Sequence, residues 1–401
     1  MNFVRIGHIR EFDGLRGIAI LLVMLNHLAP VAPLDTVLGY LKDIGWVGVD
    51  LFFVLSGFLI TGILVDTFGE PGYFRNFYAR RVLRIFPLYF LFLAFIFVVI
   101  PLPQPGTYFE TPFMQEAGSP SWYFLFLTNL KEYFTGSPAP LILQPLWSLA
   151  VEEQFYLVFP LCVFLCRDKQ LLRLIVGVII FAPVFRTILW LHDPADYHAQ
   201  YLLTPARIDN IAWGCLLALV VRGTEPTRLA SDSNRILVLA GLTAVVTLMW
   251  FELDRQTRFM QIAGSSVTAI CCTALVLWTY CQRDRWITAP LRIAPLRYIG
   301  KLCYGIYILH FFTAFAVEKV FTTLQVPVDI YGYGMMLIKM SAAIAVASAS
   351  WFCFEKPLLR LKANFEYNLA PDSVITGFGT DNNAAGLGTR STPALASNTP
   401  N

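Results

Sequence analysis

An arginine and a histidine stand at the two ends of one apolar stretch near the start of the chain. Arg16 and His27 lie in REFDGLRGIAILLVMLNH, residues 10–27. On a helix, their spacing of eleven residues places His27 about 20° past three full turns from Arg16, on the same face and ~16 Å along the axis. This spacing suits a long, thin ligand. Because an ionisable side chain is costly within an apolar helix, both residues are candidates for function.

His27 is a candidate general base, since a buried neutral imidazole can accept the proton of a hydroxyl group. The alternative is a structural histidine that is hydrogen-bonded between helices. An arginine on the same helix face, at position 16, favours the catalytic interpretation.

Three arginines lie close together in FYARRVLRIFPLY, residues 77–89. Arg81 and Arg84 are three residues apart and Arg80 and Arg84 are four apart, so at least two guanidinium groups share a helix face. Such a pair can hold phosphate groups through bidentate hydrogen bonds. Arginines at the cytoplasmic end of a helix more often only anchor its topology.

Two adjacent glutamates lie within the apolar sequence WSLAVEEQFYLVFP. On a helix, Ser148, Glu152 and Tyr156 form one stripe with a spacing of four residues. We expect Glu152 to point inward and to orient His27, as the third group of a catalytic constellation does. The alternative is a structural ion pair with an arginine in the membrane.

Other polar residues in apolar segments are expected to line a central polar cavity. Together with Tyr156, they are Asp13, Asp50, Ser56, Arg207, Asp209, Tyr307 and His310. Ser56 precedes Gly57, and this pair more often marks close helix packing than a nucleophile. Arg207 and Asp209 are also suited to pairing with other helices.

The composition predicts a polytopic all-α membrane protein. Of 401 residues, 56% are hydrophobic and 14% are charged, whereas soluble domains are about 45–50% apolar and about 25% charged. Basic residues lie in blocks between apolar runs, which is a topology signal and gives no support to nucleic-acid binding. None of the eight cysteines forms a CxxC pair, so we expect neither a disulfide framework nor a metal site.

About twenty apolar residues are needed to cross a bilayer, and ten segments pass this test. They cover residues 15–33, 46–66, 84–101, 146–166, 171–191, 204–221, 235–251, 261–281, 302–320 and 333–354. The aromatic run 121–130 is too short to span, so we expect it at the interface or re-entering the membrane. The sequence EKP at 355–357 predicts a helix boundary, because proline stops helices and lysine anchors at headgroups.

Basic residues are concentrated in the termini and loops on the N-terminal side of these segments. The opposite loops contain only Lys42, Lys131, Arg255 and Arg258. The positive-inside rule therefore predicts that both termini are cytoplasmic and that the protein is integral to the cytoplasmic (inner) membrane. Residues 1–362 form one membrane domain, and the polar residues 363–401 are expected to be a disordered cytoplasmic tail.

Taken together, these motifs resemble the acyltransferase-3 family of integral-membrane acyltransferases over about residues 8–360. They occur in family order as Arg16 with His27, GVDLFFVLSGFLI, Arg81 with Arg84 followed by Pro87 and Tyr89, WSLAVEEQFY, RIDNIAWG, YGIYILH and EKP. Cys303 is a departure, because the family pattern leads us to expect a serine before the tyrosine.

The resemblance implies transfer of an acyl group, usually acetyl, from cytoplasmic acyl-CoA to a hydroxyl group of a carbohydrate or glycolipid. It also implies that Arg16 and His27 are required and that Arg81 and Arg84 help to bind the donor. We expect His27 to deprotonate the acceptor or to take the acyl group first, with Glu152 polarising it. The basic mouth would receive the CoA phosphates, and the apolar stripe would admit the pantetheine arm.

The rival hypothesis is a transporter or flippase for a sugar or lipid-linked solute, because buried charges also line translocation pathways. The sequence shows neither an inverted repeat of two halves nor paired broken helices in matching places. These absences favour the enzyme.

Overall fold

The computed structural model describes residues 2–3, 8–30, 36–99, 112–166, 169–250, 257–326, 329, 332–367 and 375–376. This part is helical except for connections and one antiparallel pair of two-residue strands, β1 (Asn2–Phe3) and β2 (Ile375–Thr376). The helices are α1 (Arg10–Leu28), α2 (Val37–Asp43), α3 (Val47–Asp66), α4 (Tyr73–Ala94), η1 (Phe95–Val99), α5 (Pro112–Ala117), α6 (Ser121–Phe124), α7 (Thr128–Thr135), α8 (Leu146–Leu165), α9 (Lys169–His192), α10 (Tyr197–Leu202), α11 (Thr204–Gly223), α12 (Pro226–Trp250), η3 (Met260–Gly264), α13 (Ser265–Cys281), η4 (Trp286–Arg292), α14 (Ala294–Thr323), α15 (Tyr333–Ser350), η5 (Trp351–Glu355), α16 (Lys356–Leu359) and η6 (Arg360–Phe365).

Nine helices in the described residues are long and apolar enough to cross a membrane. They match nine of the ten predicted spans, which confirms the polytopic all-α class. The tenth predicted span corresponds to α1, a helix of 19 residues that carries Glu11, Asp13 and Arg16 in its first half. Several helices extend beyond the predicted spans: α4 starts at Tyr73 and α14 at Ala294. These extensions are rich in charge, so a search for apolar runs does not find them.

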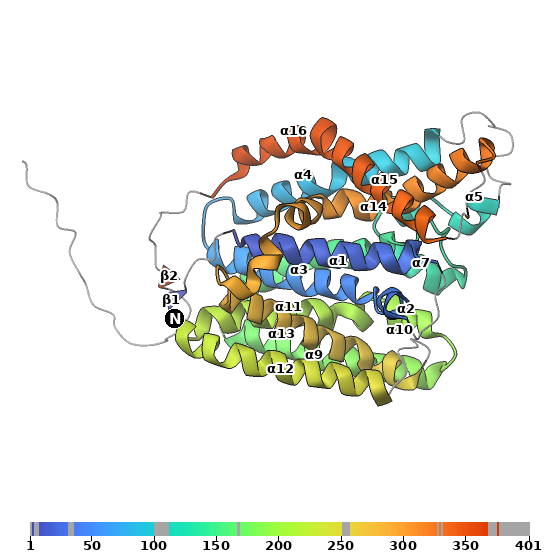
Figure 1. The fold of residues 1–401 in the computed structure, drawn as a ribbon. Coiled ribbons are helices and arrows are strands. Elements are labelled where there is room, and N and C mark those ends of the chain that lie inside the picture. Colours follow the sequence, from blue (N-terminus) through green and yellow to red (C-terminus); the bar gives the residue numbers. More distant parts are fainter. Residues whose placement is uncertain are drawn as a thin grey trace, which may run out of the picture.

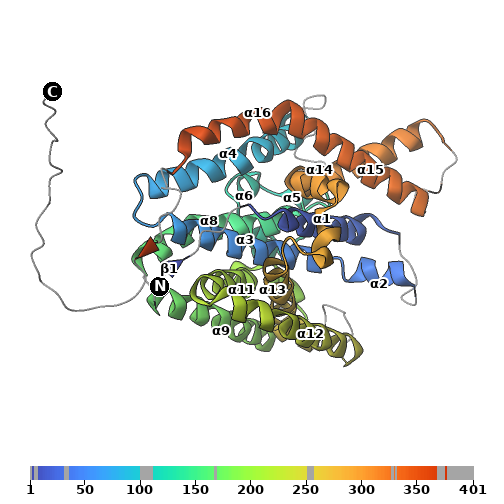
Figure 2. The same cartoon turned by 60° about the vertical axis from the view of Figure 1, so that its left-hand side comes forward.

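Helices α1 and α3 lie in the middle of the bundle (Figure 1). On one side they are covered by α14, α4, α15 and α16, and on the other by α11, α13, α9 and α12, in both views (Figure 2). The outward faces of α9 and α12 expose Ile180, Val184, Ile188, Val238 and Leu239. Such faces are stable only against an apolar medium, as expected for helices that contact lipid.

Glycines allow the central helices to approach closely. A Cβ atom at Gly57 on α3 would come within 2.0 Å of the carbonyl oxygen of Ile211 on α11. In return, a Cβ atom at Gly214 on α11 would come within 2.1 Å of the carbonyl oxygen of Val54. The two backbones are therefore in direct contact, as small residues permit in membrane bundles. This confirms that Gly57 marks helix packing.

The aromatic run 121–130 does not span the bundle, as predicted, but forms α6 and the start of α7. It packs against α8, because the Gln154 amide donates to the Phe126 carbonyl over 2.9 Å and to Asn129 Oδ1 over 3.0 Å. Lys131 is buried, and its ammonium donates to the carbonyl oxygens of Glu116, Ser137 and Pro138. Its burial lowers the pKa of the Lys131 ammonium.

The prediction that EKP ends a helix is wrong. The π-helix η5 passes into α16 at this point, and Pro357 lies in the first turn of α16, where proline is tolerated. Glu355 points inward and is buried, with one carboxylate oxygen accepting from the Ser350 hydroxyl over 3.1 Å. The predicted tail 363–401 lies outside the described residues apart from 363–367 and 375–376.

Candidate functional site

Two histidines meet where the C-terminal end of α1 packs against α14. His27 Nδ1 lies 2.9 Å from His310 Nε2, and the ring planes differ by 8°. The ring centroids are 5.1 Å apart. Near-parallel rings at this centroid distance, with nitrogens so close, must lie edge to edge. The hydrogen bond therefore runs close to both ring planes, where the donor and the lone pair of an imidazole point.

The backbone of α14 fixes the direction of this hydrogen bond. His310 Nδ1 lies 2.8 Å from the carbonyl oxygen of Tyr307 and must donate to it. In the neutral ring, His310 Nε2 is then the acceptor, and His27 Nδ1 donates to it. It follows that the lone pair of neutral His27 resides on Nε2. This is the nitrogen that can take a proton from a substrate.

His27 borders a pocket of about 190 Å³. The pocket is lined by His27, Leu28, Ala29, Pro30, Leu141, Phe311, Ala314, Phe315, Glu318, Gly332 and Lys339. Seven of its eleven lining residues are apolar, and the polar ones include one ion pair, between Lys339 and Glu318. Apolar side chains together with a few fixed polar groups and a base are the usual lining of a small-ligand site.

A second contact ties α8 to α14 one turn away from the histidine pair. The hydroxyl groups of Ser148 and Tyr307 lie 2.5 Å apart, and both are within hydrogen-bond distance of the carbonyl oxygen of Pro145, Tyr307 at 2.9 Å and Ser148 at 3.3 Å. One hydroxyl group donates to this carbonyl and the other donates to its neighbouring hydroxyl group, because each carries a single proton. These bonds hold the helix that positions His310.

Glu152 lies further along α8 and forms a cluster with α3. The Ser56 hydroxyl donates to Glu152 Oε1 over 2.6 Å and lies 2.8 Å from the Tyr156 hydroxyl. Glu152 is one turn, ~6 Å, beyond Ser148 along the helix axis. The structure thus places His310 where the sequence analysis expected Glu152 to orient His27. A role for Glu152 in polarising His27 stays a prediction.

The predicted donor-binding arginines lie next to this cluster. The Arg81 guanidinium lies 5.4 Å from the ring centroid of Tyr156 and 5.9 Å from that of Phe77. Arg84 is exposed, and Arg80 donates to the Phe365 carbonyl over 3.3 Å. The distances fit cation–π contacts for Arg81, which leave the guanidinium hydrogens available to an anion.

Arg16 and Asp13 pair on α1, with 3.3 Å between Nη1 and Oδ1. Asp13 also lies 3.1 Å from the His8 imidazole. Arg16 is in electrostatic range of Arg84 and Tyr156, so α1 carries a cation to the arginine end of the bundle and an imidazole to the other end.

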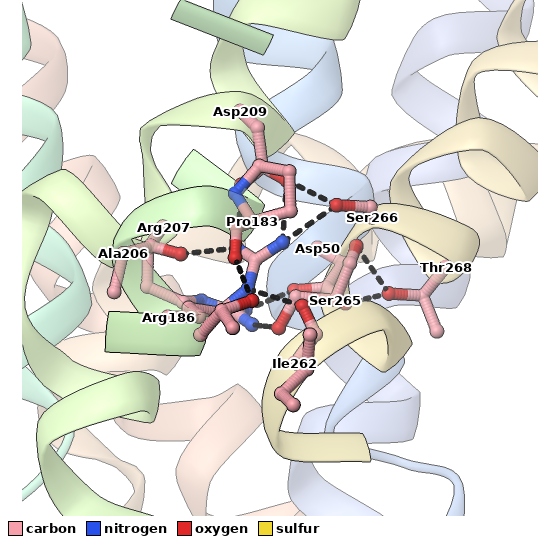
Figure 3. Close-up of polar contacts among 11 residues, drawn as sticks. Asp50, Pro183, Arg186, Ala206, Arg207, Asp209, Ile262, Ser265, Ser266 and Thr268 are labelled. Atoms are coloured by element: carbon pink, nitrogen blue, oxygen red, sulfur yellow. Dashed lines mark hydrogen bonds and ion pairs between the residues drawn. The ribbon is translucent and has the colours of Figure 1, made fainter. Parts of the chain in front are cut away.

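The remaining candidates form a buried network of two ion pairs between α3, α9, α11 and α13 (Figure 3). Arg207 pairs with Asp50, whose other oxygen accepts from Thr268 over 2.5 Å. Asp209 pairs with Arg186 through two hydrogen bonds of 3.0 Å each. This confirms the expected pairing of Arg207 and Asp209 with other helices. Their lining of a substrate cavity stays a prediction.

One residue of this network, Arg186, did not figure in the sequence analysis, and Glu355 figured there only as part of a helix boundary. Arg186 lies in the apolar sequence FAPVFRTILW, so the rule that singled out Arg16 would have found it too. Glu355 had the same signal, but its lysine and proline neighbours suggested a boundary. Among the described residues, no group of three His, Cys, Asp or Glu side chains could hold a metal ion.

The fold and these contacts define a class of protein. It is a polytopic helical membrane protein with a column of polar side chains between an arginine cluster and a pair of histidines, of which His310 is buried and His27 borders a pocket. The chain belongs to the acyltransferase-3 family, because the model of its acyltransferase domain matches residues 9–354.

Curated relatives are 26–29% identical to this chain over the aligned residues. A Listeria monocytogenes peptidoglycan O-acetyltransferase is 29% identical over 322 residues, which are 76% of this chain and 49% of the relative. A Bacillus subtilis protein provisionally named a peptidoglycan O-acetyltransferase is 28% identical over 376 residues, 88% of this chain and 55% of the relative. The chain thus spans about half the length of these relatives. No solved structure matches it.

Proposed function

We propose that the protein is a membrane O-acyltransferase that moves an acetyl group from cytoplasmic acetyl-CoA to a hydroxyl group of a carbohydrate or glycolipid. The observation that carries the proposal is the His27–His310 hydrogen bond beside a pocket. Family membership supplies the reaction class, and the names of the relatives favour O-acetylation of a carbohydrate such as peptidoglycan.

In this proposal His27 is the general base and His310 is a positioning residue. His27 Nε2 takes the proton of the acceptor hydroxyl while its oxygen attacks the thioester carbonyl. The new C–O bond replaces the C–S bond, and the thiolate leaves with the proton that His27 held. Transient transfer of the acyl group to His27 would use the same nitrogen. The His310 bond holds that nitrogen in place in either case.

The arginines define the donor end. The arginine end and the histidine end of α1 are separated by ~16 Å, a distance that an extended pantetheine arm can cover once the phosphates bind to Arg80, Arg81 and Arg84. Positive charge at this end favours its cytoplasmic location in the inner membrane. We expect Glu152, Ser56 and Tyr156 to line the path between, where they can offer hydrogen bonds to amide groups of the arm.

The test is release of free CoA from labelled acetyl-CoA by purified protein with a carbohydrate acceptor. His27→Ala should lower the rate by about 10²–10⁴-fold, the usual contribution of a general base. His198→Ala is the matched control, because His198 is half-exposed on α10 and pairs only at 3.7 Å with Asp196. Equal rates in the two variants would overturn the proposal. Solute uptake that survives His27→Ala, without CoA release, would support a transporter.

A further inference from the structure

The residues after α16 fold back along the first half of α4, as the adjacent ribbons of α16 and α4 indicate (Figure 2). The Asn76 amide donates to the Glu366 carbonyl over 3.2 Å, and the Tyr367 hydroxyl donates to the Tyr73 carbonyl over 3.2 Å. The Arg75 guanidinium lies 5.5 Å from the centre of the Phe365 ring. We name residues 360–367 the C-terminal strap.

This strap brings a fourth cation to the arginine cluster. Lys362 lies within electrostatic range of Arg84, Arg81 and Arg80, which all repel it. In the described part of the chain, no carboxylate lies within 4.0 Å of the charged nitrogens of Lys362, Arg81 or Arg84. Four like charges held together cost free energy unless an anion occupies the space between them.

Glu152 and Glu153 are in electrostatic range of Arg81, and Glu355 is in range of Arg84, so these carboxylates offset part of the positive charge, whereas Lys362 is in range of the three arginines alone. A polyanion would balance the charge that remains. Guanidinium groups bind phosphate bidentately, and a lysine ammonium adds a compact point charge to the same phosphates. We propose that the C-terminal strap is part of the donor site and that Lys362 binds the polyphosphate of the acyl donor together with Arg80, Arg81 and Arg84. The inference rests on the proposed function. The phosphate could also belong to an anionic lipid headgroup, and the experiment separates the two sources.

The test measures CoA binding to the full chain in nanodiscs of phosphatidylcholine. Lys362→Gln should weaken binding about 10-fold, as loss of one charge-assisted hydrogen bond does. Lys362→Arg should stay within about 3-fold of the wild type, because it keeps the charge. Lys356→Gln is the matched control, because Lys356 is exposed on α16, just before the C-terminal strap, and lies 5.5 Å from the centre of the Phe352 ring. It should bind CoA like the wild type.

Each outcome decides one proposal. Equal affinity of Lys362→Gln and Lys356→Gln, with weaker binding in Arg84→Gln, would overturn the role of the strap and leave the proposed function intact. Absence of CoA binding in the wild type would overturn the proposed donor itself. A further experiment uses nanodiscs that contain phosphatidylglycerol. If Lys362→Gln lowers the retention of this lipid but leaves the affinity for CoA unchanged, the site binds a lipid headgroup and the proposed role of Lys362 in CoA binding is rejected. Matching thermal stability of the variants confirms that folding is unaffected.

Discussion

His27 and His310 lie 283 residues apart in the sequence and share a hydrogen bond of 2.9 Å within nearly parallel ring planes. His310 is in turn anchored to the backbone of its own helix at Tyr307. One chain of hydrogen bonds thus selects the tautomer of His27, in the way that a second group orients a catalytic imidazole elsewhere.

The role of His310 predicts a graded effect of substitution. His310→Ala should lower kcat by roughly 10–100-fold and leave the KM for the donor within about 3-fold, because orientation is lost while the base remains. His310→Gln should recover part of the rate, since the amide oxygen can accept from His27 Nδ1. Steady-state kinetics of the two variants checks this. If alanine and glutamine at position 310 give the same kcat, His310 does not act by accepting a hydrogen bond from His27.

The glycine contact between α3 and α11 predicts opposite effects at two glycines. Gly57→Ala should lower the free energy of unfolding by ~1–3 kcal/mol, because the new methyl group meets backbone at 2.0 Å. Gly241→Ala on α12 should raise it by ~0.5–1 kcal/mol, because nothing lies within 4 Å and alanine favours the helix. Thermal unfolding in detergent measures both. Equal changes in the free energy of unfolding of the two variants would show that α3 and α11 can move apart without loss of stability.

The sequence predicts which residues share one face of a helix. It does not predict which residues of different helices are in contact, because that depends on how the helices pack. The period of 3.6 residues places Arg16 with His27 and Glu152 with Tyr156 on common faces. The partner of His27 comes from another helix far along the chain. The sequence therefore marks His310 as a residue expected to line the cavity, but no spacing rule pairs it with His27. Glu152 was assigned to His27 because both are ionisable residues in apolar segments, although ~6 Å of helix separates Glu152 from the serine that contacts α14.

The predicted starts of some helices were wrong for a related reason. Apolar runs end where charged residues begin, yet α4 and α14 continue through their arginines, because long basic side chains can pack their aliphatic part against the bundle and reach polar surroundings at its ends. Glu355 shows the same effect, since its burial depends on the space beside Gly305, where an added Cβ would lie 3.1 Å from the carboxylate. Such space is a property of packing, which the sequence alone does not display.

Glu132 on α7 predicts a dependence of stability on pH. Its burial raises the pKa of its carboxyl group above the ordinary value of 4.5, against the opposing effects of the Ala139 amide and Lys131. The folded protein therefore holds this proton more tightly than the unfolded chain. Its contribution to stability is present at low pH and is lost as pH rises from the ordinary pKa through the raised one.

At about pH 8, Glu132→Gln should consequently be more stable than the wild type, by on the order of 1 kcal/mol in the free energy of unfolding, and should melt at a higher temperature. Near pH 4 the two proteins should melt at the same temperature. Differential scanning fluorimetry across this range measures the difference. The exposed Glu225→Gln serves as control and should show no such trend. A wild type that is more stable than Glu132→Gln at high pH would contradict the sign of the shift.

The buried pair of Arg186 and Asp209 predicts strong coupling between two substitutions. Both side chains are fully buried, and Arg186 donates two hydrogen bonds of 3.0 Å to Asp209, so removing one partner leaves a charge in the bundle without its ion pair. Arg186→Met or Asp209→Leu alone should cost about 3–5 kcal/mol, whereas the double variant should cost less than either. Exposed Arg228→Met should change little. A double-mutant cycle on melting temperature gives the coupling, and additive losses would mean that Ser266 and the backbone carbonyls already neutralise each charge separately.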